Sequence, residues 1–182
     1  MKITVITVVY NDVSNIKATI DSVLSQTYDD IEYIIVDGNS DDGTLGVINN
    51  YSGIRILSES DEGIFDAMNK GINLATGDYI NFLNSGDSYT SPTIMAELVT
   101  EMLEFGDPDF VYGSSIEVDN VLCRKYHKVA RSIKWIYYGM PAHHQAMLYK
   151  MSVITQRKIK YDIKYPTAGD YAFTINFISH CG

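Results

Sequence analysis

The feature that most constrains the fold of this chain is the alternation, through its first half, of short apolar runs with segments of helical periodicity. The run ITVITVV at Ile3–Val9 is continuous and rich in β-branched residues, which is typical of a strand buried on both faces. The segment Ser14–Gln26 then places its apolar residues at helical spacing. Repetition of this order predicts an α/β fold with a mostly parallel central sheet and helices on both faces.

The other elements follow from the same signals. Further strands are predicted at residues 31–36, 54–57, 78–83 and 110–112. Further helices are predicted at residues 42–51, 63–75 and 91–105. Beyond residue 112 we expect a hairpin within 118–129 around Asp119-Asn120, a helical aromatic segment at 130–138, a strand at 147–149 and a helix at 170–178.

Composition excludes several classes of protein. The 182 residues carry a formal net charge of −9, which argues against a nucleic-acid partner, since duplex binding requires Lys and Arg against the phosphates. A nucleotide ligand is still compatible with this charge, because a divalent metal ion can supply the missing positive charge. No run of 18 apolar residues is present, so no transmembrane segment is expected.

The chain shows no internal repeat, low-complexity tract or linker, and we predict a single domain over residues 1–182. Its two widely spaced cysteines, Cys123 and Cys181, do not make a disulfide framework and favour a reducing cytoplasm. The sequence ends beside an apolar helix, and we expect a domain truncated at its C-terminus.

Polar, Asp-bearing segments follow three of the predicted strands. They are Tyr10–Asp12, Asp37–Ser40 and Asn84–Asp87. In an open parallel sheet, ligands bind beyond the carboxyl ends of the strands. We therefore expect all three segments to lie on one rim.

The turn Asn84–Asp87 has two interpretations. Mg²⁺ takes hard oxygen ligands, usually one or two carboxylates together with waters and phosphate oxygens, and Asp87 could be such a ligand. Equally, Asp87 could be a solvated carboxylate in a turn that precedes a helix.

The segment VDGNSDDGT separates two kinds of acidic residue. Asp37 lies at the tip of a buried strand, where a carboxylate can accept a hydrogen bond from a nucleotide base. Asp41, Asp42 and Thr44 are natural helix caps, and we favour capping over ligand contact for them.

In the segment DEGIFDAMNKG, the apolar residues Ile64, Met68 and Ile72 are expected to face the core. We expect that Asp66, Asn69 and Lys70 are not all required for folding. Asn69 could brace the loop after the first strand, and a ligand role or a buried structural amide is an equal alternative for it.

The segment PAHHQ contains adjacent histidines, His143 and His144, followed by Gln145. Adjacent side chains point in different directions and no further ligand completes a tetrahedral zinc set, so we expect a pocket wall here. Asp170 starts the last predicted helix, and from the residues alone an N-cap role is favoured.

Taken in order, the segments TVVYN, VDGNSDDGT, DEGIFDAMNKGINLATGDYINFLNSGD, HHQ and GDYAF resemble the family 2 inverting glycosyltransferases of the GT-A fold, in particular those of bacterial polysaccharide assembly. The resemblance spans nearly the whole chain, from Lys2 to about Phe177. It implies a Rossmann-like GT-A domain whose residues 1–87 bind the sugar nucleotide and whose residues 88–182 form the acceptor side.

The resemblance also implies roles for the residues. Metal binding (Mg²⁺ or Mn²⁺, on the donor diphosphate) falls to Asp87, and the general base is Asp170. Donor contacts are implied or considered at Val8, Tyr10, Asp37, Asp66, Asn69, Lys70 and Asn84. The acceptor or leaving-group side is implied at His143, His144 and Gln145.

Two departures from the family pattern affect these roles. The metal motif of relatives often reads D-A-D-D, whereas Asn84 and Gly86 leave Asp87 as the sole carboxylate of this turn, so metal affinity should depend on the bound diphosphate. Many relatives have Arg where Met68 stands, and Lys70 is the substitute considered for that cation.

The implied function is a metal-dependent inverting glycosyltransferase of the hexosyltransferase type. It would transfer a sugar from a nucleoside-diphosphate sugar to a saccharide or lipid-linked saccharide in cell-surface polysaccharide synthesis. It would work in the cytoplasm, with peripheral contact to the inner face of the membrane. Alternatives are a catalytically silent sugar-nucleotide-binding or scaffolding domain and a nucleotidyltransferase, although TVVYNDVSN lacks the Gly-rich basic loop of the latter. Donor sugar, acceptor and oligomeric state stay open.

Overall fold

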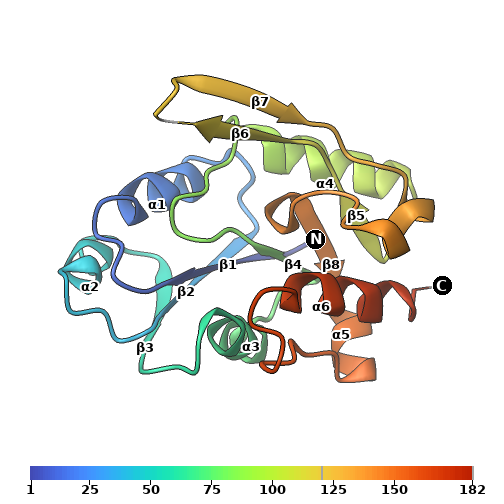
Figure 1. Ribbon diagram of the computed structural model, residues 1–182. Helices are drawn as coiled ribbons and strands as arrows, with labels where there is room; N and C mark the ends of the chain where they lie inside the picture. Colours follow the sequence, from blue (N-terminus) through green and yellow to red (C-terminus); the bar gives the residue numbers. More distant parts are fainter. Residues whose placement is uncertain (120, 182) are drawn as a thin grey trace.

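The computed structural model describes residues 1–119 and 121–181. Its centre is a six-stranded sheet in the order β3-β2-β1-β4-β8-β5 (Figure 1). The four parallel strands are β1 (Ile3–Val9), β2 (Ile31–Asp37), β3 (Ile54–Ser58) and β4 (Tyr79–Phe82). β8 (Met147–Lys150) runs antiparallel to both β4 and β5 (Phe110–Tyr112). The predicted α/β architecture is confirmed.

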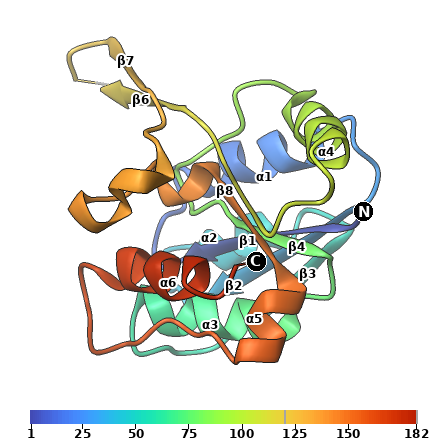
Figure 2. The same cartoon turned by 90° about the vertical axis from the view of Figure 1, so that its right-hand side faces the viewer.

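Helices cover both faces of this sheet (Figure 2). One face packs against α1 (Ile16–Leu24), α2 (Thr44–Ile48) and α4 (Ile94–Glu104). The other packs against α3 (Ile64–Leu74), α5 (Met151–Arg157) and α6 (Gly169–Ile178). Within the described residues, no helix combines the length and the apolar character needed to cross a bilayer.

The second half of the chain departs most from the prediction. The hairpin forms from β6 (Ser115–Asp119) and β7 (Arg124–Lys128), while Asn120, on which its turn was predicted, lies outside the described residues. The aromatic segment is a 3₁₀ helix, η1 (Ile133–Tyr138), and a second one, η2 (His144–Ala146), precedes β8. Helix α5 was not predicted.

Two details of the first half were wrong. The predicted helix at 42–51 is the five-residue α2, which begins after Gly43 in a left-handed conformation, with φ +101°. Ile64 does not face the core, because its side chain is 46% exposed, and Phe65 is buried instead. Met68 and Ile72 are buried as predicted, so the difference is confined to the first turn of α3.

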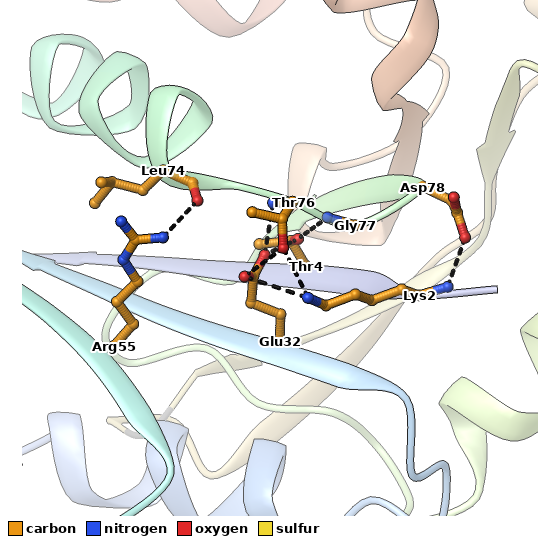
Figure 3. A network of polar contacts seen from close by, with 8 residues as sticks. All are labelled: Lys2, Thr4, Glu32, Arg55, Leu74, Thr76, Gly77 and Asp78. Atoms are coloured by element: carbon orange, nitrogen blue, oxygen red, sulfur yellow. Dashed lines mark hydrogen bonds and ion pairs between the residues drawn. The ribbon is translucent and has the colours of Figure 1, made fainter.

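A carboxylate network closes the amino end of the sheet (Figure 3). Glu32 accepts hydrogen bonds from Thr4 Oγ1 at 2.6 Å, from Thr76 N at 2.7 Å and from Thr76 Oγ1 at 2.7 Å, and Lys2 Nζ lies 3.5 Å from its Oε1. Burial raises the pKa of Glu32, but these hydrogen bonds and the Lys2 charge outweigh it and lower the pKa to about 2. Glu32 is thus a structural anion that joins β1, β2 and the turn before β4.

Candidate active site

Three strand ends meet at the opposite, carboxyl edge of the sheet. Val9 pairs with Asp37 across β1 and β2, and Ser85 N donates to Val8 O at 3.3 Å. The segments that follow β1, β2 and β4 therefore lie side by side, and the predicted shared rim is confirmed. Ser85 Oγ also donates to Asp12 Oδ2 at 2.7 Å, which joins two of these segments directly.

The rim around β1 and β2 is held by Asp37. Its carboxylate is fully buried and accepts from Ser58 Oγ at 2.6 Å and from Ser40 N at 3.2 Å. Val8 is buried beside it, whereas Tyr10 is 65% exposed on the rim. In this structure the Asp37 carboxylate acts as a brace for the loop, and Tyr10 presents an open aromatic face.

Asp61 lies close to Tyr10, although the sequence analysis assigned no role to this first residue of DEGIFDAMNKG. A Cβ atom on Gly38 would lie 2.8 Å from Asp61 Oδ2 and 3.2 Å from the Tyr10 ring, so the Gly38 backbone passes directly between them. The signal that could have found Asp61 is its position three residues after β3, the fourth strand that ends at this edge.

The turn that carries Asp87 is fixed from two sides. Thr19 Oγ1, from α1, accepts from Gly86 N at 3.0 Å and donates to Asp87 O at 2.8 Å. Gly86 has φ +91°, a conformation that favours glycine. Gln145 Nε2 donates to Asp87 Oδ2 at 2.8 Å. The structure thus brings together Asp87 and Gln145, which are 58 residues apart.

A second pair from the same two segments extends this cluster. Asn84 Nδ2 lies 3.1 Å from His144 Nε2, and His144 Nδ1 lies 3.9 Å from Asp170 Oδ2. Because an amide NH₂ only donates, His144 Nε2 accepts and the neutral ring carries its proton on Nδ1, facing Asp170. Burial lowers the pKa of His144, although Asp170 and Asp87 partly oppose this. A chain of polar groups therefore runs from Asn84 through His144 to Asp170.

Two oxygens of this cluster, Asn84 Oδ1 and Gln145 Oε1, are buried and accept no hydrogen bond within the described residues. Buried acceptors without partners cost free energy and indicate a missing ligand, ion or water. Gln145 contacts the Asp87 carboxylate, and carboxylate and amide oxygens are ligands that Mg²⁺ and Mn²⁺ accept. The residues present fit a divalent cation.

Protein ligands alone do not complete such a site. Among the residues that the structure describes, no group of three or more His, Cys, Asp or Glu side chains is placed to hold a metal ion. The remaining ligands would have to come from waters and from phosphate oxygens of a bound nucleotide.

The residues alone suggested that Asp170 is the N-cap of α6, and this prediction is wrong. The cap position is Ala168, and Asp170 is the second helical residue, with Oδ1 accepting from Tyr171 N at 2.8 Å. Gly169 lets the start of α6 approach α3 closely, because a Cβ at this position would lie 2.6 Å from the Phe65 ring of α3. The Asp170 carboxylate is therefore positioned by direct packing of α6 on α3.

Three residues of α3 make structural contacts away from this cluster. Asn69 pairs with the backbone of Tyr161 through both amide atoms, at 2.9 Å each. It does not brace the loop after β1 and is a structural amide. Lys70 Nζ contacts Glu59 at 2.9 Å and Asp66 at 3.4 Å.

A cleft of about 560 Å³ opens beside Asp87 between α4 and β6. Its lining includes the polar residues Asp87, Gln145 and His143 and the apolar residues Leu98, Ile116 and Val118. His143 Nδ1 lies 3.1 Å from Ser115 Oγ at this wall. Polar groups and an apolar wall thus share one cavity next to the candidate metal site.

The sequence model of Glycosyl transferase family 2 matches residues 4–166 of the chain. The chain belongs to this family. A PGL/p-HBAD biosynthesis glycosyltransferase of Mycobacterium tuberculosis is 29% identical over 176 residues, which cover 90% of this chain and 64% of that protein. An uncharacterized glycosyltransferase of the same species is 30% identical over 98% of this chain and 70% of its own length.

In Escherichia coli, the UDP-Glc:alpha-D-GlcNAc-diphosphoundecaprenol beta-1,3-glucosyltransferase WfaP is 31% identical over 66% of this chain and 58% of its own length. The family 2 chain described here thus spans about 60% to 70% of the length of these curated relatives.

Solved structures confirm the GT-A fold. S. aureus TarS 1-349 in complex with UDP superposes with a TM-score of 0.83 at 19% identity, covering 100% of this chain and 56% of that one. Mannosyltransferase PcManGT from Pyrobaculum calidifontis, in complex with GDP-Man and Mn²⁺, gives a TM-score of 0.73 at 19% identity, covering 97% and 51%.

Proposed function

We propose that this family 2 chain is a metal-dependent inverting glycosyltransferase that moves a sugar from a nucleoside-diphosphate sugar to a hydroxyl acceptor. The observation that carries the proposal is the chain of polar groups from the Asp87 turn to Asp170. It would join a metal-binding carboxylate from the middle of the sequence, Asp87, to a general base near its end, Asp170.

In this proposal, residues 1–87 bind the nucleotide. Tyr10 stacks on the base, and Asp61 and Asp37 are the carboxylates at the base end of the rim. Val8 supports Tyr10 from the core. The solved relatives that hold UDP, UDP-GlcNAc or GDP-Man support a sugar-nucleotide donor.

Asp87 would hold a Mg²⁺ or Mn²⁺ ion together with the diphosphate, and the oxygens of Asn84 and Gln145 would accept from its waters or from sugar hydroxyls. When bound, the ion would neutralise charge that develops on the leaving nucleoside diphosphate. The Mn²⁺ complex of PcManGT supports this use of a metal. For Asp66, Asn69 and Lys70 the contacts described above support a structural role in place of the donor contact considered from the sequence.

Asp170 would remove the proton of the acceptor hydroxyl while its oxygen attacks the anomeric carbon from the side opposite the diphosphate. This single displacement inverts the anomeric configuration. His144, with its Nδ1 proton toward Asp170, would keep that carboxylate oriented. General-base assistance contributes roughly 10²–10⁴-fold to the rate.

The acceptor would enter through the cleft between α4 and β6, within residues 88–182. The polar residues His143 and Gln145 suit a saccharide, and the apolar wall suits a lipid-linked one. The WfaP and PGL relatives support a role in cell-surface glycan assembly. We place the protein in the cytoplasm, at the inner face of the membrane.

A thermal-shift panel of nucleoside diphosphates with and without Mn²⁺ tests the donor site. A ligand present at 100 times its Kd stabilises the native state by about 2.7 kcal/mol, so one diphosphate should raise the Tm only when Mn²⁺ is present. The Asp87→Ala variant is the matched control and should show no Mn²⁺-dependent shift. Equal Mn²⁺-dependent Tm shifts in the wild type and in Asp87→Ala would refute metal binding by Asp87.

Release of nucleoside diphosphate from the matching sugar nucleotide then tests catalysis. A protein that binds the donor with Mn²⁺ but never releases the diphosphate would be the catalytically silent binding domain.

A further inference from the structure

The basic residues of this chain are concentrated in one segment. Residues 120–161 contain nine of the 14 Lys and Arg residues and no Asp or Glu. The rest of the chain therefore carries five basic residues against all 23 acidic ones. A protein with a net charge of −9 thus has a strongly positive region between two acidic ones.

Part of this region projects from the body of the protein. In Figure 2 the β6–β7 hairpin stands out at the upper left, and the orange segment that contains η1 lies below it on the same side. Every described residue from Val121 to Val129 is exposed. We call the described surface formed by β7 and η1, residues 121–138, the basic-aromatic face.

Acidic neighbours neutralise only part of its charge. Lys128 Nζ pairs with Glu117 at 2.9 Å, and Arg124 lies opposite Asp119 in the strand register. Lys125, Arg131 and Lys134 are exposed, and none of them makes an ion pair with another residue of the described ranges 1–119 and 121–181. Three cations on this face are therefore available to an external anion.

The same face exposes large apolar side chains, which solvated charged surfaces usually do not. Trp135 is 61% exposed, Tyr137 79%, Tyr138 84% and Val121 91%. Trp135 and Tyr138 contact each other edge to face, with ring centroids 5.7 Å apart. Trp and Tyr next to Lys and Arg are the combination enriched where a protein meets the interface of a bilayer.

The segment below these side chains is firmly anchored. Ile136 is buried, and its carbonyl accepts from Tyr171 Oη of α6 at 2.7 Å. Arg131 N donates to Pro141 O at 2.7 Å, and Ser132 Oγ caps the start of η1. The aromatic side chains are thus presented by an ordered support and lose little conformational freedom on binding.

We propose that the basic-aromatic face binds the surface of an anionic lipid bilayer. The cations match the phosphates of the lipid headgroups, and the aromatic and aliphatic side chains enter the interface. A soluble polyanion would use the cations and leave the apolar side chains in water, so it accounts for half of the surface only.

The position of the basic-aromatic face gives membrane binding a role in acceptor capture. This role rests on the proposed function. β6, the partner strand of β7, supplies Ile116 and Val118 to the cleft that leads to Asp87. Docking of β7 and η1 on a bilayer would hold the mouth of this cleft at the lipid surface, where a lipid-linked acceptor is found.

Vesicle co-sedimentation tests the proposal without any need for transfer activity. The probes are vesicles of phosphatidylcholine alone and of phosphatidylcholine mixed equally with phosphatidylglycerol. Each basic side chain near an anionic surface contributes about 1 kcal/mol, or roughly five-fold in partitioning. The triple variant Lys125→Gln, Arg131→Gln, Lys134→Gln should therefore lose roughly 100-fold in partitioning to the mixed vesicles.

The matched control changes the same net charge at the end of α5, on the lower right of Figure 2, through Arg157→Gln, Lys158→Gln and Lys160→Gln. It should retain vesicle binding. Equal loss in both triple variants would overturn the assignment to this face. Mn²⁺-dependent Tm shifts with a nucleoside diphosphate, measured on all three proteins, show separately whether the proposed donor site holds.

A variant with Trp135→Ser, Tyr137→Ser and Tyr138→Ser distinguishes a bilayer from a polyanion. It should bind vesicles at least roughly 10-fold more weakly at a salt concentration that screens the charges. Vesicle binding that is unchanged in this variant, and abolished by soluble polyphosphate in the wild type, would identify a polyanion site and refute the proposal.

Discussion

At the amino end of the sheet, both Glu32 carboxylate oxygens accept hydrogen bonds, whereas at the carboxyl end Asn84 Oδ1 and Gln145 Oε1 are buried and accept none within the described residues. Both ends join strands through polar side chains. A buried polar group with all its partners stabilises the fold, and one without partners costs free energy until something binds. The contrast separates the end of the sheet whose acceptors are paired within the fold from the end that keeps acceptors for a ligand, an ion or water.

The largest expected effect is a loss of activity at the carboxyl end of the sheet, where we propose the active site. Asp170→Asn should lower the rate of sugar transfer roughly 10²–10⁴-fold because the amide cannot accept the proton. The free energy of unfolding should stay within about 0.5 kcal/mol of wild type. Transfer rates and Mn²⁺-dependent diphosphate binding are to be measured together, and a parallel loss of binding would show that Asp170 is not the general base.

The next largest effect is a loss of stability at the amino end of the sheet, around Glu32. Glu32→Ala leaves Lys2, Thr4 and Thr76 without their common acceptor and should lower the free energy of unfolding by about 3 kcal/mol. Urea denaturation measures this change. Diphosphate binding by the folded fraction should be unchanged, since the network lies at the other end of the sheet, and a change in Kd would mean that the two ends are coupled.

Lowering the pH should remove the stabilisation that the hydrogen bonds of Glu32 provide. The folded pKa of Glu32, about 2, lies below the unfolded value of 4.5. Its stabilisation is therefore fully present above pH 4.5 and is lost as the pH falls toward about 2. With a reduction for the partly exposed side chain, the loss should be about 2 kcal/mol. Urea midpoints from pH 5 downward in wild type and in Glu32→Gln check this, because the variant should lack that part of the pH dependence.

The smallest effect should separate stability from function. Gln145→Met removes a buried acceptor without a partner and also the hydrogen bond to Asp87, at nearly constant volume, and these two changes offset each other, so stability should stay within about 1 kcal/mol of wild type. Mn²⁺-dependent diphosphate binding should weaken, because Asp87 loses its hydrogen-bond donor and the site loses an oxygen. Calorimetry on the variant checks both quantities, and a destabilised protein with intact binding would reverse our interpretation of this end.

The sequence predicts well which segments lie at the carboxyl edge of the sheet. It predicts incompletely how Asp87, His144 and Asp170 come together, and the reason is physical. Burial on both faces of a parallel sheet leaves a strong local pattern in Ile3–Val9, and the positions of Tyr10, Asp37 and Asp87 follow from it. The 3.9 Å approach of His144 to Asp170 depends on β8 inserting antiparallel beside β4, which the residues of β8 do not signal. Asn69 was equally ambiguous, because a buried amide and a ligand amide look the same in sequence.

The packing of Tyr161 has a consequence for the synthesis of the chain. Its ring lies between Phe65 and Phe173, with centroid distances of 5.3 Å and 4.2 Å. Tyr161 and Phe173 are synthesised long after Phe65, so the Phe65 ring lacks both partners until translation has passed them. We expect nascent chains that stop before Ile159 to be aggregation-prone and to require a chaperone. Asp170, the proposed general base, can take its position beside α3 only when translation has passed α6.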